Sequence, residues 1–97
     1  MEIKILKKAA NELRIEIEGE GHTFCNTLQK ALSEDETIEM AGYDIEHPLT
    51  SSPTVYVRTK EKRKPQDALI DAAKKIQERS KEFKESFERA LKEWSRK

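Results

Sequence analysis

The stretch PQDALIDAAKKIQERSKEFKESFERALKEWSRK, residues 65–97, has no glycine and no proline after its first residue, and it predicts one uninterrupted helix. Less polar residues recur along it every three or four positions, which keeps them on one helix face. These positions are Leu69, Ala73, Ile76, Ser80, Phe83, Phe87, Ala90 and Trp94, with Leu91 beside them. Such a helix would run about 50 Å, whereas a compact body of about 60 residues is only about 20–25 Å across. We therefore expect part of the stripe to overhang its own domain and to bury its aromatic residues against a partner.

Composition and charge describe a small chain that gains from association. The 97 residues predict one domain, 1–97, and with 35% hydrophobic and 39% charged residues its core is limited, so a partner would add burial. Residues 1–59 hold 6 Lys/Arg and 11 Asp/Glu, and residues 60–97 hold 13 and 8, so the two parts carry −5 and +5. The charges of the second part alternate in sign and pair at i,i+4, which is typical of a solvated helix surface rather than a nucleic-acid site.

The chain has the features expected of a cytoplasmic protein. Its one cysteine, Cys25, excludes an internal disulfide framework and suits a reducing compartment. No apolar run approaches the length of a membrane span. The first residues alternate isoleucine with charged residues, unlike a signal peptide.

Two runs near the N-terminus, residues 2–8 and 12–18, predict a β-hairpin. Leu13, Ile15 and Ile17 alternate with Arg14, Glu16 and Glu18. Strict alternation of this kind is typical of a half-buried strand with one wet face. The connection between the two runs is short, so the strands are expected to pair.

A helix is expected after Gly21, capped by His22 or Thr23. Its apolar face carries Phe24, Cys25, Leu28, Ala31 and Leu32. We expect this face to pack between the sheet and the C-terminal helix.

Two further strands are predicted, over residues 37–46 and from Val55 to Thr59. The apolar phase of the first slips near Gly42, where a bulge is expected. Residues 47–53 read as a loop and residues 60–64 as a charged linker. The order ββαββα predicts an α+β, two-layer fold: a four-stranded antiparallel sheet with two helices on one face, the C-terminal helix being long.

Residues that could carry chemistry are few and scattered. His22, Cys25 and His47 are the candidate soft metal ligands, fewer than the four of a structural zinc site, and Cys25 lies on the apolar helix face. The carboxylates Glu34, Asp35 and Glu36 share one turn, with no sign that two of them face each other across a cleft. We therefore expect no catalytic, cofactor-binding or metal-binding residue.

Three segments resemble the small alpha-like assembly subunits of cellular DNA-directed RNA polymerases. Glu20–Leu28 resembles the start of their first helix, Ala41–Leu49 their third strand and His-Pro turn, and Thr59 with Pro65–Leu69 the entry into their C-terminal helix. The segments occur in family order, and the length fits the archaeal members, known as subunit L. Eukaryotic counterparts and the N-terminal dimerisation domain of bacterial alpha are more distant relatives. Gly21 departs from the pattern, because the family usually has an acidic residue there.

The resemblance implies a non-catalytic subunit that pairs through its two helices with a larger homologue, the D subunit in archaea. The heterodimer would then serve as the platform for the two large catalytic subunits. Partner contacts are expected at Phe24, Leu28 and Leu32 as well as along the C-terminal stripe. The resemblance also implies that the chain itself has no cofactor, no membrane contact and no sequence-specific contact with nucleic acid.

On the residues alone, two other functions stay open. A homodimerising ββαββα regulatory or ligand-binding module would form one discrete species when purified, whereas a dedicated heterodimer half would be poorly soluble or loosely associated. A small enzyme would be indicated by a saturable ligand that raises the melting temperature.

Overall fold

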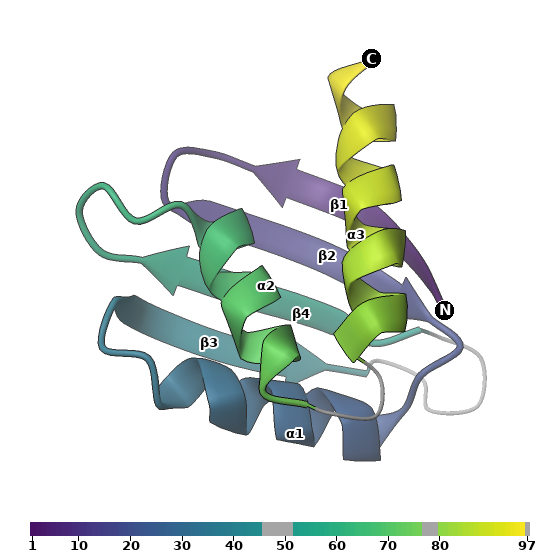
Figure 1. Cartoon of the computed structure of the whole chain (residues 1–97), viewed down its shortest axis with the longest axis horizontal. Helices are drawn as coiled ribbons and strands as arrows, with labels where there is room; N and C mark the ends of the chain where they lie inside the picture. Colours follow the sequence, from purple (N-terminus) through teal and green to yellow (C-terminus); the bar gives the residue numbers. More distant parts are fainter. Residues whose placement is uncertain (46–51, 77–79, 97) are drawn as a thin grey trace.

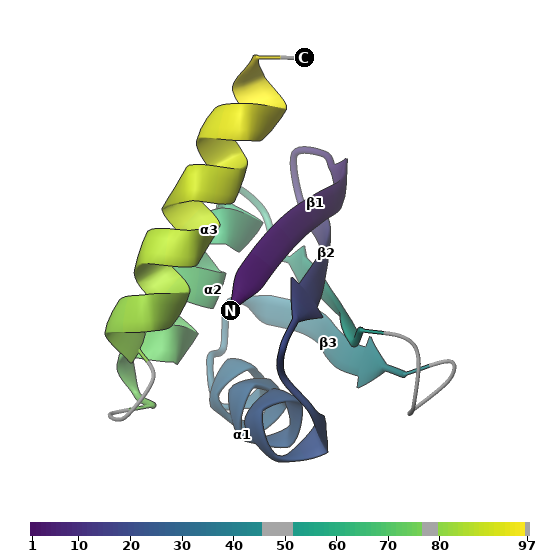
Figure 2. The ribbon, with the colours of Figure 1, turned by 90° about the vertical axis from the view of Figure 1, so that its right-hand side faces the viewer.

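The chain folds into one antiparallel sheet with three helices on one side of it (Figure 1, Figure 2). The computed structural model describes residues 1–45, 52–76 and 80–96. Its elements are β1 (Glu2–Lys8), β2 (Glu12–Glu18), α1 (His22–Ser33), β3 (Ile38–Asp44), β4 (Thr54–Thr59), α2 (Pro65–Lys74) and α3 (Ser80–Ser95). The strand order is β1-β2-β4-β3, with every neighbouring pair antiparallel. The predicted α+β class is confirmed, with one helix more than expected.

The inner face of the sheet follows the alternation seen in β2. Leu13, Ile15 and Ile17 are at most 1% exposed. In the neighbouring strand β4, Val57 pairs with Leu13 and Val55 pairs with Ile15. Because successive side chains in a strand point to opposite faces, the charged residues between them face away from the helices. The buried aliphatic side chains form one hydrophobic cluster with those of the three helices.

The bulge in β3 lies earlier than the sequence predicted. The register shifts between Ile38 and Met40, whereas Gly42 pairs regularly with Tyr56, so the prediction of a bulge at Gly42 is wrong. Ile38 and Tyr43 both pair with inward-facing positions of β4, and an extra residue must lie somewhere between them. The exposed residue Glu39 fills that role, near the start of the strand. A second shift, in β1 between Ile5 and Lys7, was not predicted, although it falls at Leu6, where the alternation of apolar and charged residues breaks.

The N-cap of helix α1 lies one residue before the predicted cap positions. Gly21 is the N-cap and makes no side-chain capping bond, and its carbonyl accepts a hydrogen bond from the Cys25 amide at 3.2 Å. The prediction that His22 or Thr23 caps the helix is therefore wrong. The predicted apolar face is confirmed, because all five of its residues are buried.

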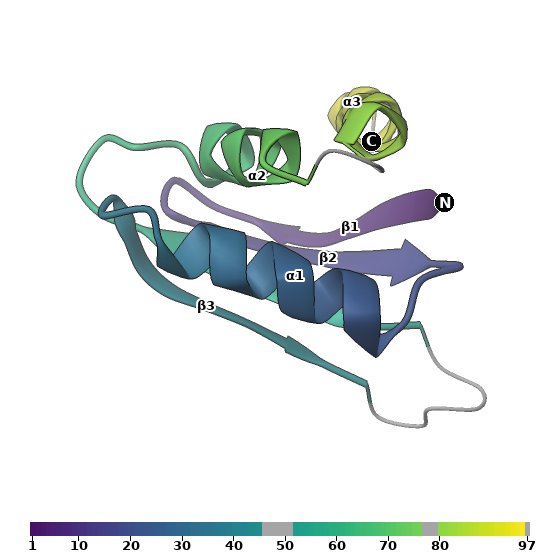
Figure 3. The ribbon, with the colours of Figure 1, turned by 60° about the horizontal axis from the view of Figure 1, so that its bottom comes forward.

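The C-terminal stretch forms two helices, so the prediction of one uninterrupted helix is wrong. Pro65 and Asp67 occupy the first turn of α2 as expected, but this helix ends at Lys74. The amides of Lys75 and Ile76 then bond the carbonyls three residues back, which tightens the last turn. Helix α3 starts at Ser80 and lies beside β1 (Figure 1, Figure 3).

Burial explains why the helix is interrupted although its sequence contains no helix breaker. A continuous helix over residues 65–97 would run about 50 Å, longer than the 37 Å of the molecule's longest axis. Full burial stabilises each such side chain by about 1.5–3 kcal/mol, whereas each helix hydrogen bond given up contributes about 0.5–1.5 kcal/mol net. The burial of two phenylalanines and Ala90, with the half-buried Trp94, is therefore worth as much as several helix hydrogen bonds.

Candidate dimerisation surface

The residues predicted to bind a partner are brought together by the fold, but most of them lie in the core of this chain. Eight are buried: Phe24, Leu28, Leu32, Leu69, Ala73, Phe83, Phe87 and Ala90. Ile76, Leu91 and Trp94 are half-buried and pack against the core from outside. Ser80 is the first residue of α3.

Two aromatic residues of α3 are buried in the core, and one of them packs against α1, instead of overhanging the domain. Phe83 and Phe87 are both 0% exposed. The Phe83 ring lies 5.9 Å from that of Phe24 and 5.8 Å from that of Phe87, centroid to centroid and tilted. The expected overhang is thus wrong for these residues, because the break after Lys74 turns α3 back over its own sheet.

Polar contacts hold α3 against the N-terminal strand. The buried hydroxyl of Ser86 donates a hydrogen bond to the Met1 carbonyl at 3.0 Å. The Met1 ammonium lies 3.1 Å from the Oε1 atom of Glu82. Neither contact was predicted, since Ser86 and Met1 are 85 positions apart in the chain.

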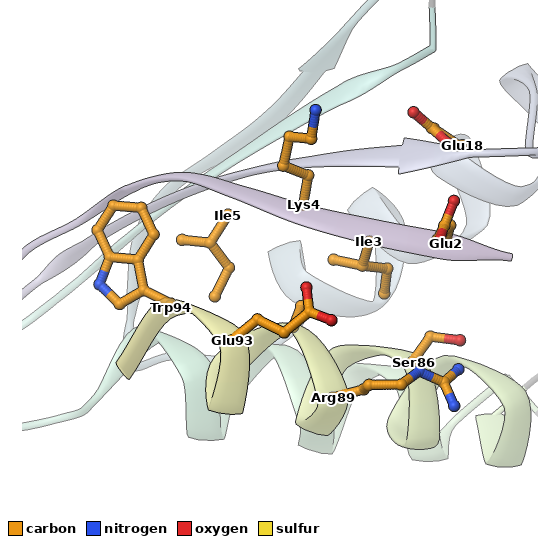
Figure 4. A pocket seen from close by; sticks show the side chains of 10 residues that line it. Glu2, Ile3, Lys4, Ile5, Glu18, Ser86, Arg89, Glu93 and Trp94 are labelled. Carbon is orange, nitrogen blue, oxygen red and sulfur yellow. The ribbon is translucent and has the colours of Figure 1, made fainter. Parts of the chain in front are cut away.

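A groove of about 300 Å³ lies between β1 and α3 (Figure 4). Ile3 and Ile5 line it from the strand, and Ala90 and Trp94 from the helix, with Trp94 beside Ile5 at one end (Figure 4). Its charged residues are Glu2, Lys4, Glu18, Arg89 and Glu93. An apolar strip edged by charges of both signs can receive an apolar side chain of another protein.

On α2, a half-buried apolar residue lies outside the predicted stripe. Ile70 packs against the core from α2 and keeps part of its surface in solvent. It follows Leu69 directly and therefore falls outside the narrow three-and-four spacing. A wider apolar face, as globular helices often have, would have included it.

The candidate chemical groups are held in structural contacts. His22 Nδ1 lies 3.1 Å from the Tyr43 hydroxyl in an exposed pair. Cys25 is 1% exposed, and burial raises the pKa of its thiol to about 11, so it stays protonated and unreactive. His47 lies outside the described residues. Among the residues that the structure describes, no three His, Cys, Asp or Glu side chains are grouped to hold a metal ion.

The acidic turn and the basic linker are joined by a cluster that the sequence did not predict. Arg63 lies 2.7 Å from Asp71 and 3.4 Å from Asp35, with which Thr37 also forms hydrogen bonds. The bonds from Thr37, and then the charge of Arg63, lower the pKa of Asp35. Arg63 is therefore part of the fold, although the linker as a whole was expected to be solvated.

No helix in the described parts of the chain is long and apolar enough to cross a membrane.

Similarity to known proteins places the chain in a class that works by pairing with another chain. Residues 12–86 match the family described as the RNA polymerase Rpb3/Rpb11 dimerisation domain, and the chain belongs to this family. It is thus a dimerisation domain and not a catalytic one.

Individual relatives are archaeal RNA polymerase subunits. The Rpo11 subunit of Methanocella arvoryzae is 46% identical over 87 residues, which cover 90% of this chain and 94% of the relative. That of Pyrococcus furiosus is 44% identical, covering 95% and 99%. The crystal structure of RNA polymerase subunit L from Thermoplasma acidophilum superposes with a TM-score of 0.69 at 26% identity, over 96% of this chain and 91% of that one. Recognition of the alpha-like small subunits from three sequence segments is confirmed.

Proposed function

We propose that this chain, acting as one domain, is a non-catalytic assembly subunit of a cytoplasmic DNA-directed RNA polymerase. In this role it pairs with the larger alpha-like subunit, the archaeal D subunit, and the heterodimer is the platform for the two large catalytic subunits. The match of residues 12–86 to a dimerisation domain carries the proposal, since this range includes three of the four strands and all of α1 and α2. The Rpo11 relatives supply the link to polymerase.

The helical layer is the surface that we assign to the larger alpha-like partner. Residues that are already fully buried cannot gain contact area from a partner that leaves the fold unchanged. Ile76, Leu91 and Trp94 can, because each is half-buried and adjoins the core. The groove between β1 and α3 adds an apolar strip beside Trp94. The eight buried positions of the predicted set then support this surface from beneath.

The test is co-expression with the larger alpha-like partner from the same organism, followed by size-exclusion chromatography. We expect a one-to-one complex, and we expect Leu91→Asp to weaken it at least tenfold, which corresponds to about 1.4 kcal/mol. A partner covering Leu91 would otherwise bury an unpaired charge. Lys92→Asp, next to it on α3 and exposed, is the matched control and should bind like wild type. The melting temperature of each free variant separates lost binding from lost folding.

Two outcomes would contradict parts of the proposal. If the free chain forms one discrete homodimer and ignores the larger alpha-like partner, the chain is a homodimerising module instead. If Leu91→Asp and Trp94→Ala both bind that partner as wild type does, the partner contacts another surface, although the role as a polymerase subunit stands.

A further inference from the structure

The side of the sheet opposite the helices carries an uncovered patch that the dimerisation surface does not use. In the described parts of the chain the three helices lie on one side of the sheet, and the other side is open (Figure 2). Among the residues that the structure describes, two large hydrophobic side chains are exposed to solvent: Met40, at 56%, and Leu6, at 43%. Met40 pairs with Arg58, an outward-facing position, and Leu6 lies at the β1 bulge beside the outward-facing Lys7. The exposed apolar side chains therefore lie at the two edges of one end of this open face.

Between them lies a row of cations around one aromatic ring. The guanidinium carbons of Arg14 and Arg58 lie 5.3 Å and 5.9 Å from the centroid of the Tyr56 ring. Lys7 pairs with Arg14 in the neighbouring strand. We call Lys7, Arg14, Tyr56 and Arg58 the basic patch.

The charge of the basic patch is only partly neutralised within the chain. The Glu12 carboxylate forms ion pairs with both Lys7, at 2.9 Å, and Arg58. Three cations and one carboxylate leave two positive charges. Arg14 is exposed, its guanidinium lies over the Tyr56 ring, and within the described residues it forms no ion pair. Its fork of donors is thus available to a carboxylate of another molecule.

The two ends of the open face differ in charge, which gives an incoming segment a direction. At the end away from the basic patch, Glu16 pairs with Thr54, which in turn pairs with Asp44, and Glu2 pairs with Glu18. Lys4 is the one basic residue in these rows. An acidic segment is repelled from this end and attracted to the basic patch.

A glycine leaves room for a side chain of the partner beside the aromatic ring. Gly42 lies directly opposite Tyr56, and a Cβ atom added there would meet no other atom within 4 Å. The backbone of β3 is therefore bare next to the ring, two residues along the strand from Met40. An apolar or aromatic side chain can pack in this space while carboxylates of the same segment reach Arg14.

We propose that the basic patch, with Met40, Leu6 and Gly42, is the docking site for an acidic segment bearing apolar side chains on one of the large polymerase subunits. The inference rests on the proposed function. The two faces of a sheet point in opposite directions, so a larger alpha-like partner bound to the helical layer leaves this face to another subunit. The residual positive charge selects acidic side chains, and the exposed apolar residues select hydrophobic ones.

The test uses the reconstituted heterodimer with the larger alpha-like partner, titrated against the immobilised large subunits at two salt concentrations. Arg14→Gln removes the unpaired charge, and Gly42→Leu fills the open space without touching the core. Both variants should keep the melting temperature of the free chain and the affinity for the alpha-like partner. Both should bind the large subunits at least tenfold more weakly, and Arg14→Gln should also flatten the salt dependence. Arg96→Gln, an exposed arginine just beyond the end of α3, is the matched control and should bind as wild type does.

Each contrary result has its own signature. If both variants bind the large subunits as tightly as wild type, the patch is not their docking site. If either variant loses the alpha-like partner while it stays folded, the patch belongs to that partner instead. Self-association of the free chain, or binding of a labelled single-stranded RNA 20-mer, that disappears in Arg14→Gln would assign the patch to a second copy or to nucleic acid. If wild type never pairs with the alpha-like partner, the proposed function fails, and this inference fails with it.

Discussion

The hairpin with α1 and the C-terminal helices bury comparable apolar side chains, yet only the first region folds as its sequence predicts. In residues 2–33 the strands, the helix and the inward face follow local patterns, and only the helix cap and the register shift in β1 differ from the prediction. In residues 65–95 the same kind of apolar periodicity is present, but the helix is interrupted after Lys74. The difference is one of length: a seven-residue strand fits the sheet, whereas a helix spanning the whole C-terminal stretch would extend beyond the rest of the molecule. Periodicity therefore identifies which residues are buried, and the size of the remaining fold decides where the helix must turn.

Phe83→Asp should have the largest effect, because it tests whether burial holds α3 in place. A charge at a position that is 0% exposed and next to Phe24 and Phe87 should destabilise the fold by several kcal/mol. The measurement is a denaturant titration of the free chain, with the neighbouring exposed residue in Lys84→Asp as the control. A loss below about 0.5 kcal/mol, within the range of ordinary surface changes, would show that Phe83 does not face the core.

Leu28→Ala tests the other side of the comparison, the region that its own sequence predicts. Leu28 is 0% exposed between the sheet and the helices, so truncation should cost about 2–5 kcal/mol. Asn26→Ala, on the exposed side of α1, should be close to neutral. A loss below about 0.5 kcal/mol in the same titration would place Leu28 at the surface.

Ser86→Ala should have a smaller effect and reports on the polar attachment of α3 to the N-terminus. Removing the hydrogen bond to the Met1 carbonyl should cost about 0.5–1.5 kcal/mol. Ser95→Ala removes an exposed bond within α3, from the Ser95 hydroxyl to the Leu91 carbonyl, and is the matched control. Equal denaturation midpoints for the two variants would mean that the hydrogen bond from Ser86 to Met1 contributes nothing to stability beyond the control bond.

The smallest effect is expected at Glu12, on the open face of the sheet. Hydrogen bonds from Lys7, then Arg58 and Tyr56, lower its pKa from 4.5 to about 2. Because the folded-state pKa lies below the unfolded value, ionised Glu12 stabilises the fold above about pH 4.5, and this contribution is lost as the pH falls toward 2. The difference in melting temperature between wild type and Glu12→Gln should therefore shrink over that interval. A difference that stays constant from about pH 6 to about pH 2.5 would show that Glu12 is not held by these partners.

The sequence by itself determined the faces of the elements and the family. Leu13, Ile15 and Ile17 must share one face because a strand has a period of two, and Phe24, Leu28 and Leu32 share another because they recur every helical turn. The segments Glu20–Leu28, Ala41–Leu49 and Pro65–Leu69 were enough to recognise the alpha-like subunits. Each of these features depends on residues close together in the chain.

Only the tertiary structure decided how α3 turns, where the sheet bulges and which charges pair. The break after Lys74 is set by the burial of Phe83 and Phe87 against elements far away in sequence, since no residue between Lys74 and Ser80 is a glycine or a proline. The bulge at Glu39 is set by the need of Ile38 and Tyr43 to face the same core. The open face acquired its basic patch because the pairing of β1, β2 and β4 placed Lys7, Arg14 and Arg58 in adjacent strands. These choices balance energies summed over contacts between distant segments, and local sequence patterns carry no record of that sum.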